Sequence, residues 1–203
     1  MRIVIPADRP KYERPLPDGS VVTLSPILKT DREFFEKALE EMSLESRFSR
    51  FAHGLSSLSP QEVDYLTDVD QQHHVAWGAA IEDEVAGAGR YIVEADGRCA
   101  EVAVTVLDAM QRRGVGRALF EALLAVARHD GLHEFCFEAL ADNEAVLRLV
   151  REVEVAPLVA NGVIERRIPL SSLPASEHDE ALVAVVDEIR DQRARGSGSL
   201  NEG

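Results

Sequence analysis

Long apolar runs, cysteine and positive charge are all scarce in this chain of 203 residues, and each shortage excludes a class of protein. No apolar run approaches the roughly 20 residues of a membrane-spanning helix, and Pro6, Asp8 and Arg9 stand where a signal peptide needs apolar residues. Lys and Arg number 22 against 36 Asp and Glu, and the net charge of −14 disfavours nucleic acid and anionic membranes as partners. These shortages predict a cytoplasmic protein that binds neither a membrane nor a nucleic acid.

The chain has only two cysteines, Cys99 and Cys136, and both fall in expected strands without His or Cys neighbours at zinc-ligand spacing. Buried free thiols are therefore favoured over a disulfide or a metal site. His73 and His74 could line a pocket, but adjacent strand residues face opposite sides of a sheet and cannot bind one metal together. The sequence predicts no metal ion.

What the chain does contain is a glycine-punctuated basic loop after an apolar strand. Val102 to Leu107 predict the strand, and Gln111 to Arg117 form a loop that opens a helix near Gly114 to Ala118. The two glycines allow a tight bend, so successive N–H groups point into one concavity at the positive end of the helix dipole. Three arginines of the loop can add donors for phosphate groups: Arg112, Arg113 and Arg117.

Two other phosphate-binding motifs are excluded by their spacing. A Walker loop requires Gly-Lys-Ser/Thr, where this chain has Gly116, Arg117 and Ala118. A dinucleotide fingerprint requires a third glycine three positions after Gly116, where this chain has Leu119. The loop therefore predicts a phosphate site of another kind.

The remaining pattern predicts an α/β (α+β) chain with one main domain. Alternating apolar residues and short turns predict strands over 20–28, 75–81, 85–94, 98–107, 133–140, 153–160 and 163–168. Caps and helical spacing predict helices over 31–42, from 59 onward, over 114–130, over 142–152 and over 177–194. We expect residues 1–18 to be extended on the surface, 171–176 to be a linker and the Gly/Ser tail to be disordered.

The pattern Gln-x-x-Gly-x-Gly-Arg of Gln111 to Arg117, after a strand that begins near Glu101, resembles the coenzyme A loop of the GNAT family of N-acetyltransferases. The resemblance extends from about Gly19 to about Leu170, and the expected order β-α-α-β-β-β-α-β-α-β-β is the order of that family. It implies a GNAT fold in residues 19–170, with a mixed central sheet of about six to seven strands flanked by helices. Residues 171–203 then form a linker, an amphipathic helix and a tail.

The resemblance also implies acetyl-CoA as cosubstrate, bound in a V-shaped gap between the fourth and fifth strands of the family. The backbone N–H of Val104 would face the thioester carbonyl and stabilise the developing oxyanion. Asn143 would meet the pantetheine or a bound water, or would be only a residue of a helix N-terminus. The implied cofactor-binding residues are Val104, Thr105, Val106, Gln111, Arg112, Arg113, Gly114, Val115, Gly116, Arg117 and Asn143.

Glu101 is the candidate catalytic base, because this family often keeps a carboxylate where its fourth strand begins. An alkylammonium has a pKa near ~10, so attack at neutral pH requires a proton acceptor, directly or through water. The alternative is an exposed strand-end glutamate that is solvated or paired with Arg98 or Arg90.

A second resemblance concerns the acceptor. The segments 44–51, 58–62, 65–70 and 74–76 are similar to bacterial protein lysine acetyltransferases of the Pat type. Those enzymes carry this domain after a cyclic-nucleotide-binding domain or an acyl-CoA-synthetase-like region, and we expect neither region in this chain. The resemblance implies a protein lysine as acceptor, and the negative charge favours an amine or a lysine-rich surface. A homodimer is possible in such a family.

Several departures from the family keep other functions open. No tyrosine follows Tyr91 to protonate the leaving thiolate, Arg151 and Glu152 stand where the family has Gly-Phe, and Ser25 replaces an arginine before Pro26. The region after Asn143 is also shortened. A small-amine acetyltransferase for polyamines or amino acids, and an acyl-CoA-binding sensor without catalysis, therefore stand beside the protein lysine acetyltransferase.

Overall fold

The computed structural model of the chain describes residues 5–33, 59–140, 158–160 and 163–198. The expected helices over 31–42 and 142–152 lie largely or wholly outside these residues, as does Asn143. No helix in the described part of the chain combines the length and apolar character needed to cross a membrane.

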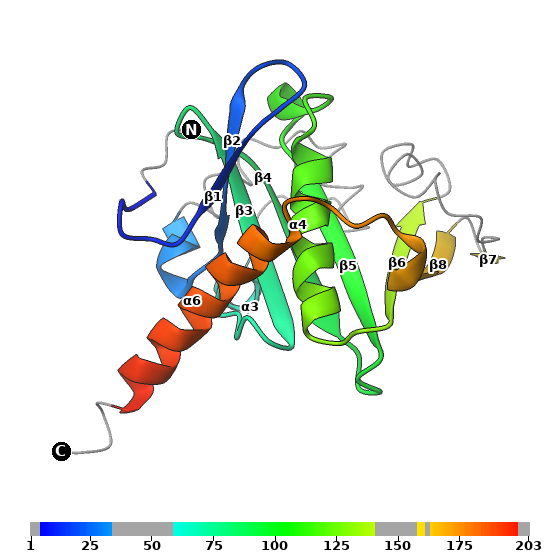
Figure 1. Cartoon of the computed structure of the whole chain (residues 1–203). Coiled ribbons are helices and arrows are strands. Elements are labelled where there is room, and N and C mark those ends of the chain that lie inside the picture. Colours follow the sequence, from blue (N-terminus) through cyan, green and yellow to red (C-terminus); the bar gives the residue numbers. More distant parts are fainter. Residues whose placement is uncertain (1–4, 34–58, 141–157, 161–162, 199–203) are drawn as a thin grey trace.

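A single mixed sheet organises the fold (Figure 1). In the described residues the sheet has eight strands in the order β1-β2-β3-β4-β5-β6-β8-β7, and all neighbours are antiparallel except β5 and β6. The strands are β1 (Tyr12–Pro15), β2 (Val21–Pro26), β3 (His74–Ile81), β4 (Glu84–Val93), β5 (Cys99–Val106), β6 (Glu134–Leu140), β7 (Leu158–Ala160) and β8 (Val163–Pro169). The helices are α3 (Pro60–Thr67), α4 (Val115–His129) and α6 (Asp179–Gly198), with short 3-10 turns η1 (Lys29–Asp31), η2 (Asp108–Met110) and η3 (Leu170–Ser172).

The sheet confirms the fold class, and its eight described strands exceed the six to seven expected. The additional strand is β1, which pairs with β2 from Tyr12 to Pro15. Proline has no N–H to donate to a neighbouring strand, so a short strand that ends in Pro15 suits the edge of the sheet. Gly19, with φ +85°, closes the turn between the two strands.

Local signals explain the helices that flank the sheet. Ser59 accepts a hydrogen bond from the Glu62 N–H, and the Glu62 carboxylate accepts one from the Ser59 N–H, so α3 begins at a capping box. Gly131, with φ +77°, ends α4 by a Schellman turn in which the Leu132 N–H reaches the Ala127 carbonyl.

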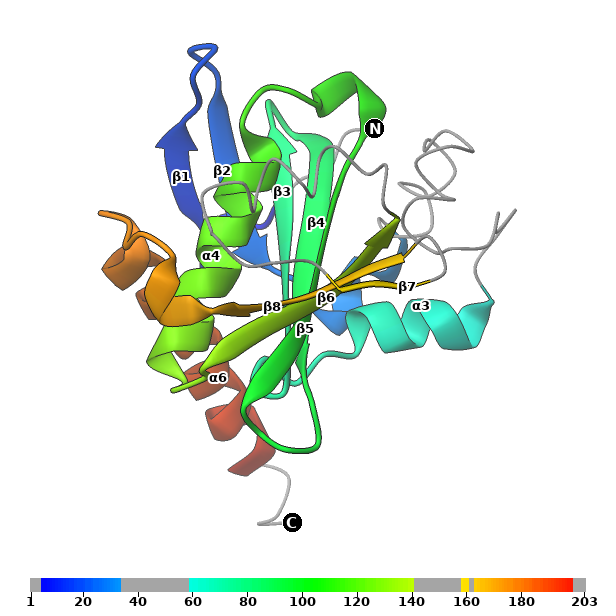
Figure 2. The ribbon, with the colours of Figure 1, turned by 90° about the vertical axis from the view of Figure 1, so that its right-hand side faces the viewer.

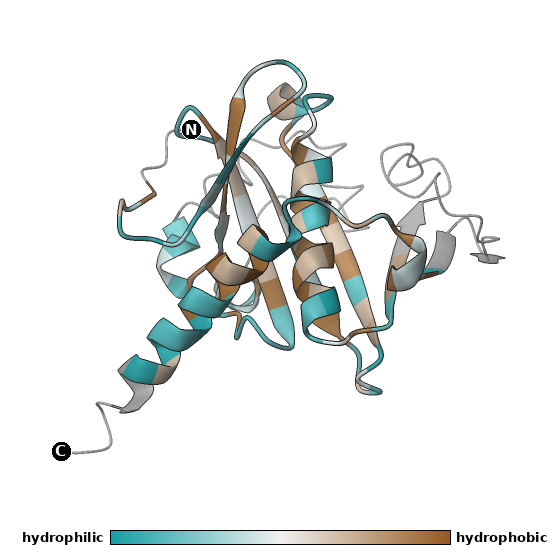
Figure 3. Cartoon of the chain, in the orientation of Figure 1, coloured by the Kyte–Doolittle hydropathy of each residue, from teal (hydrophilic) through white to brown (hydrophobic). Residues whose placement is uncertain are grey.

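Figure 2 shows α4 and α6 on one face of the sheet and α3 on the other. The main core lies between the sheet and α4, where Trp77, Tyr91, Leu119, Leu123 and Phe135 are fully buried. Hydrophobic residues are visible mainly on the strands and on α4, whereas the outer part of α6 is hydrophilic (Figure 3). The inner side of α6 joins the same core through Leu182 and Val186.

Candidate active site

The parallel strands β5 and β6 separate after a short ladder. Only three pairs join their described residues, and the last of them is Glu101 with Cys136. β5 continues to Val106 and β6 to Leu140 without further pairing to each other, and Figure 2 shows the two strands diverging. Because β1 is the additional strand, β5 and β6 correspond to the fourth and fifth strands of the expected fold.

Beyond Glu101, some backbone groups of β5 point toward the β6 side but are not paired with β6. The Leu107 N–H donates to the Ala86 carbonyl of the preceding strand, 2.9 Å away. Backbone direction alternates along an antiparallel ladder, so Thr105 also faces β4, whereas the N–H and C=O of Val104 and Val106 point toward the β6 side. Of the three residues expected to offer backbone groups, Val104 and Val106 have the required direction.

The glycine-rich loop lies where β5 ends and α4 begins. Gly114 has φ +100° and Arg112 has φ +61°, so the chain turns sharply just before Val115, the first residue of α4. The first amide groups of a helix have no intrahelical acceptor, and the first turn of α4 contains no acidic residue to compete for them. A Cβ added at Gly116 would lie 3.4 Å from Val106, so this glycine packs the helix start against β5.

The polar side chains of the loop divide into two groups. Arg113 binds the Asp18 carboxylate at 2.6 Å and so ties the loop to the turn between β1 and β2. Hydrogen bonds from Ser20 and then Arg113 lower the pKa of Asp18 to about 2. Gln111 donates to the Val106 carbonyl at 3.4 Å, while Arg112 is exposed and Arg117 is 63% exposed beside Glu121. Arg112 and Arg117 therefore lie where they can meet an anion from solvent.

Glu101 is exposed on the sheet face opposite α4. The register places Cys136, Glu101, Ile92 and His74 in one row across four strands, with their side chains on that face. Val102, the next residue of β5, points to the other face and is buried in the main core.

A polar and aromatic cluster lies on the same face and was largely missed by sequence reasoning. The Arg90 guanidinium lies 5.4 Å from the Tyr65 ring centre, and the ring centres of Tyr65 and His74 are also 5.4 Å apart. Burial, then the charge of Arg90, lowers the pKa of His74 to about 4, so this imidazole is neutral at neutral pH. Only the two-residue period of the strands could have indicated that His74, Arg90 and Glu101 share a face.

The two cysteines are free thiols. Cys99 is buried as expected, whereas Cys136 is partly exposed. Tyr91 is buried and donates a hydrogen bond to Asp130, and burial raises its pKa well above the usual range, so it acts as a structural residue.

Comparison with known proteins supports the family resemblance seen in the sequence. The model of the Acetyltransferase (GNAT) family matches residues 36–153. An acetyltransferase of Pseudomonas aeruginosa is 31% identical over 136 residues, which cover 64% of this chain and 73% of that protein. Acetyltransferase Pat of Mycolicibacterium smegmatis is 28% identical over 178 residues, 85% of this chain and 52% of that protein. The chain therefore spans about half the length of that relative.

Solved structures agree in fold. The crystal structure of the GNAT domain of PAT from S. lividans has a TM-score of 0.72 and 30% identity, covering 82% of this chain and 99% of that domain. An acetyltransferase from Salmonella typhimurium with its cofactor acetyl-CoA shares the fold at 18% identity, with a TM-score of 0.60 and coverage of 76% and 96%. Spermidine N-acetyltransferase from Vibrio cholerae, in complex with CoA and spermine, shares it at 19% identity, with a TM-score of 0.59 and coverage of 74% and 96%. Because the family model matches more than half of the sequence, the chain belongs to the GNAT family of acetyltransferases and is related to Pat.

Proposed function

We propose that the chain transfers an acetyl group from acetyl-CoA to the side-chain amine of a protein lysine. The observation that carries the proposal is the divergence of β5 from β6 directly beside a helix start that can hold a pyrophosphate. An extended pantetheine arm can pair with the outward N–H and C=O groups of Val104 and with the N–H of Val106, as an added strand would. The Val106 carbonyl already accepts a hydrogen bond from Gln111. The pyrophosphate then meets the amides of Val115 to Arg117 and the side chains of Arg112 and Arg117.

The proposed reaction is direct attack of the amine on the thioester. The nitrogen forms a bond to the acetyl carbon, its proton passes to Glu101 directly or through water, and the carbon–sulfur bond breaks to release the coenzyme A thiolate. The Val104 N–H stabilises the negative charge on the carbonyl oxygen. A thiol with a pKa near ~8.5 is a tolerable leaving group, so the reaction does not require a tyrosine as general acid.

Three observations support a protein lysine as the acceptor. Two relatives at 28 to 30% identity are Pat proteins. The net charge of −14 favours a cationic acceptor. Glu101 is exposed, which suits an acceptor that approaches as a side chain from another protein. We keep residues 19–170 as the proposed boundaries of the acetyltransferase domain.

The test is calorimetric titration with acetyl-CoA, followed in the same preparation by measurement of thiol release. Acceptors should include an acyl-CoA synthetase protein, the same protein with its lysines chemically blocked, polyamines and free amino acids. We expect binding, and release that requires unblocked lysines. Faster release with a small amine than with any protein would identify a small-amine acetyltransferase, and binding without release would indicate a sensor.

A further inference from the structure

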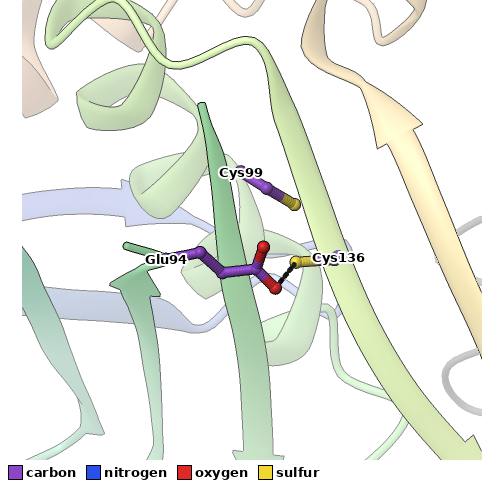
Figure 4. Close-up of side chains that lie close together, drawn as sticks. All are labelled: Glu94, Cys99 and Cys136. Atoms are coloured by element: carbon purple, nitrogen blue, oxygen red, sulfur yellow. Dashed lines mark hydrogen bonds between the residues drawn. The ribbon is translucent and has the colours of Figure 1, made fainter. Parts of the chain in front are cut away.

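Three side chains with metal-binding atoms converge beside the ladder between β5 and β6 (Figure 4). They are Glu94, which follows β4, Cys99 at the start of β5 and Cys136 in β6. One ligand atom from each lies within 4.8 Å of those of the other two. The Cys136 thiol donates to a Glu94 carboxylate oxygen at 3.2 Å. We call these three residues the thiol–carboxylate cluster.

The sheet itself brings the cluster together. The Glu94 N–H donates to the Cys99 carbonyl at 2.8 Å, which places Glu94 across from Cys99. Cys136 pairs with Glu101, two residues beyond Cys99 on the same face of β5. Backbone pairing thus places two strand residues and the residue that follows β4 close together before any ligand arrives. Sequence spacing could not reveal this arrangement.

A disulfide does not fit this arrangement. The register partner of Cys99 is Glu134, so the two cysteines are offset by two residues along adjacent parallel strands. Such an offset separates their Cα atoms by about 8 Å, beyond the roughly 7 Å that a disulfide can span without backbone movement. Two thiolates on one tetrahedral zinc lie only roughly 3.8 Å apart, given Zn–S bonds of about 2.3 Å, and side-chain rotation can reach that separation.

The charge and the exposure of the cluster also fit a cation. Arg167 pairs with Glu94 at 3.5 Å and with Glu134 at 3.8 Å, so a positive side chain already borders the cluster. Two thiolates and one carboxylate around a divalent ion leave a single negative charge, which Arg167 can balance. Glu94 is exposed and Cys136 is partly exposed, so an ion can enter from solvent.

We propose that Glu94, Cys99 and Cys136 form a binding site for a thiophilic divalent cation of the zinc type. Binding converts two thiols to thiolates and releases their two protons to solvent. The three protein ligands leave a fourth position for water or another small ligand, as in tetrahedral zinc sites with an open position. The proposal differs from the expectation, drawn from sequence spacing, that the chain binds no metal.

The cluster lies beside the proposed catalytic base. Cys136 lies directly opposite Glu101, and Cys99 precedes Glu101 by two residues on the same face. The cation site is argued from the cluster alone and does not depend on the proposed function.

The experiment measures metal binding to the full chain, reduced and freed of metal by chelation. Calorimetry with zinc chloride should give one equivalent, and substitution by cobalt should give the intense near-ultraviolet absorption of thiolate ligation. Cys136→Ser should weaken zinc binding at least about 100-fold and remove that absorption. Glu134→Gln, a change to the neighbouring carboxylate that also contacts Arg167, is the matched control and should keep both signals.

Cys99 is buried, so a failure of Cys99→Ser to fold is not informative by itself. X-ray absorption at the zinc edge on the wild-type protein provides an independent measurement. Two sulfur neighbours are expected, and a shell of nitrogen and oxygen alone would overturn the proposal, as would zinc affinity unchanged by Cys136→Ser. A protein that binds zinc through two sulfurs yet shows no acetyl transfer would retain this site and reject the proposed function.

Discussion

Glu101 of β5 lies directly across from Cys136 of β6, and this is the last pair before the two strands separate. Up to Glu101, β5 is paired with both β4 and β6. Beyond Glu101, at Val104 and Val106, β5 is paired with β4 alone. The backbone of Glu101 is paired on both sides, while its side chain is exposed. The proposed base therefore lies at the point where β5 and β6 separate.

Replacing Glu101 with glutamine should lower acetyl transfer about 10²-fold or more at neutral pH, because the amide cannot accept the proton of the amine. Acetyl-CoA affinity should stay within about 2-fold, since the proposed cofactor contacts lie further along β5 and in the loop. Steady-state thiol release and calorimetry measure the two effects. Glu134→Gln serves as the control, and a near-wild-type rate for Glu101→Gln would remove Glu101 as the base.

Gly116 tests the phosphate loop. Gly116→Asp places a negative charge where the pyrophosphate is proposed to bind and should weaken acetyl-CoA affinity at least about 10²-fold. Gly116→Ala is the matched control, because its added Cβ meets Val106 at 3.4 Å, close to an ordinary contact, and it should fold with much smaller loss of affinity. Equal affinities for the aspartate and alanine variants would contradict the loop assignment.

The sequence predicted the elements whose signals are local. The capping box of Ser59 and Glu62, the strands from β3 to β5 and the stop of α4 at Gly131 all follow from neighbouring residues. The turn between β3 and β4 also formed as expected, with Glu82 and Asp83 both at positive φ.

Contacts that depend on register could not be predicted in the same way. The proximity of Cys99 to Cys136, and of Arg90 to Tyr65, depends on how separate strands and helices align. Strand β1 was not predicted because its prolines and charges are typical of a surface segment, and only pairing with β2 makes it a strand. The family resemblance therefore predicted the cofactor-binding residues and Glu101, whereas the contacts between strands became evident only from the sheet register.

Helix α6 should contribute to the stability of the whole domain. Leu182 is 1% exposed and packs in the core that includes α4, so Leu182→Ala should lower the free energy of unfolding by about 2–4 kcal/mol. Glu188→Ala, at an exposed position of the same helix, should change it by no more than about 0.5 kcal/mol. Urea unfolding measures both, and equal values would show that α6 is only peripheral.

His74 should make stability depend on pH in a defined window. Its pKa is about 4 in the folded protein, against 6.5 for an ordinary histidine, because burial and Arg90 oppose its charge while Asp70 favours it. The Tyr65 ring packs against the imidazole, with the two ring centres 5.4 Å apart. Between these two pH values the unfolded chain binds more protons, so the free energy of unfolding falls as the pH falls.

Substitution of His74 by glutamine removes this titration. The wild type should therefore lose about 1–2 kcal/mol more than His74→Gln between pH 6.5 and pH 4, a discounted figure because His74 is partly exposed. Urea unfolding across that range measures the difference, and His133→Gln, at an exposed histidine, is the control. Parallel stability profiles for wild type and His74→Gln would show that the imidazole is not held neutral. The chain would then present a histidine that can be charged on the Glu101 face, and a cationic acceptor would be repelled there at mildly acidic pH.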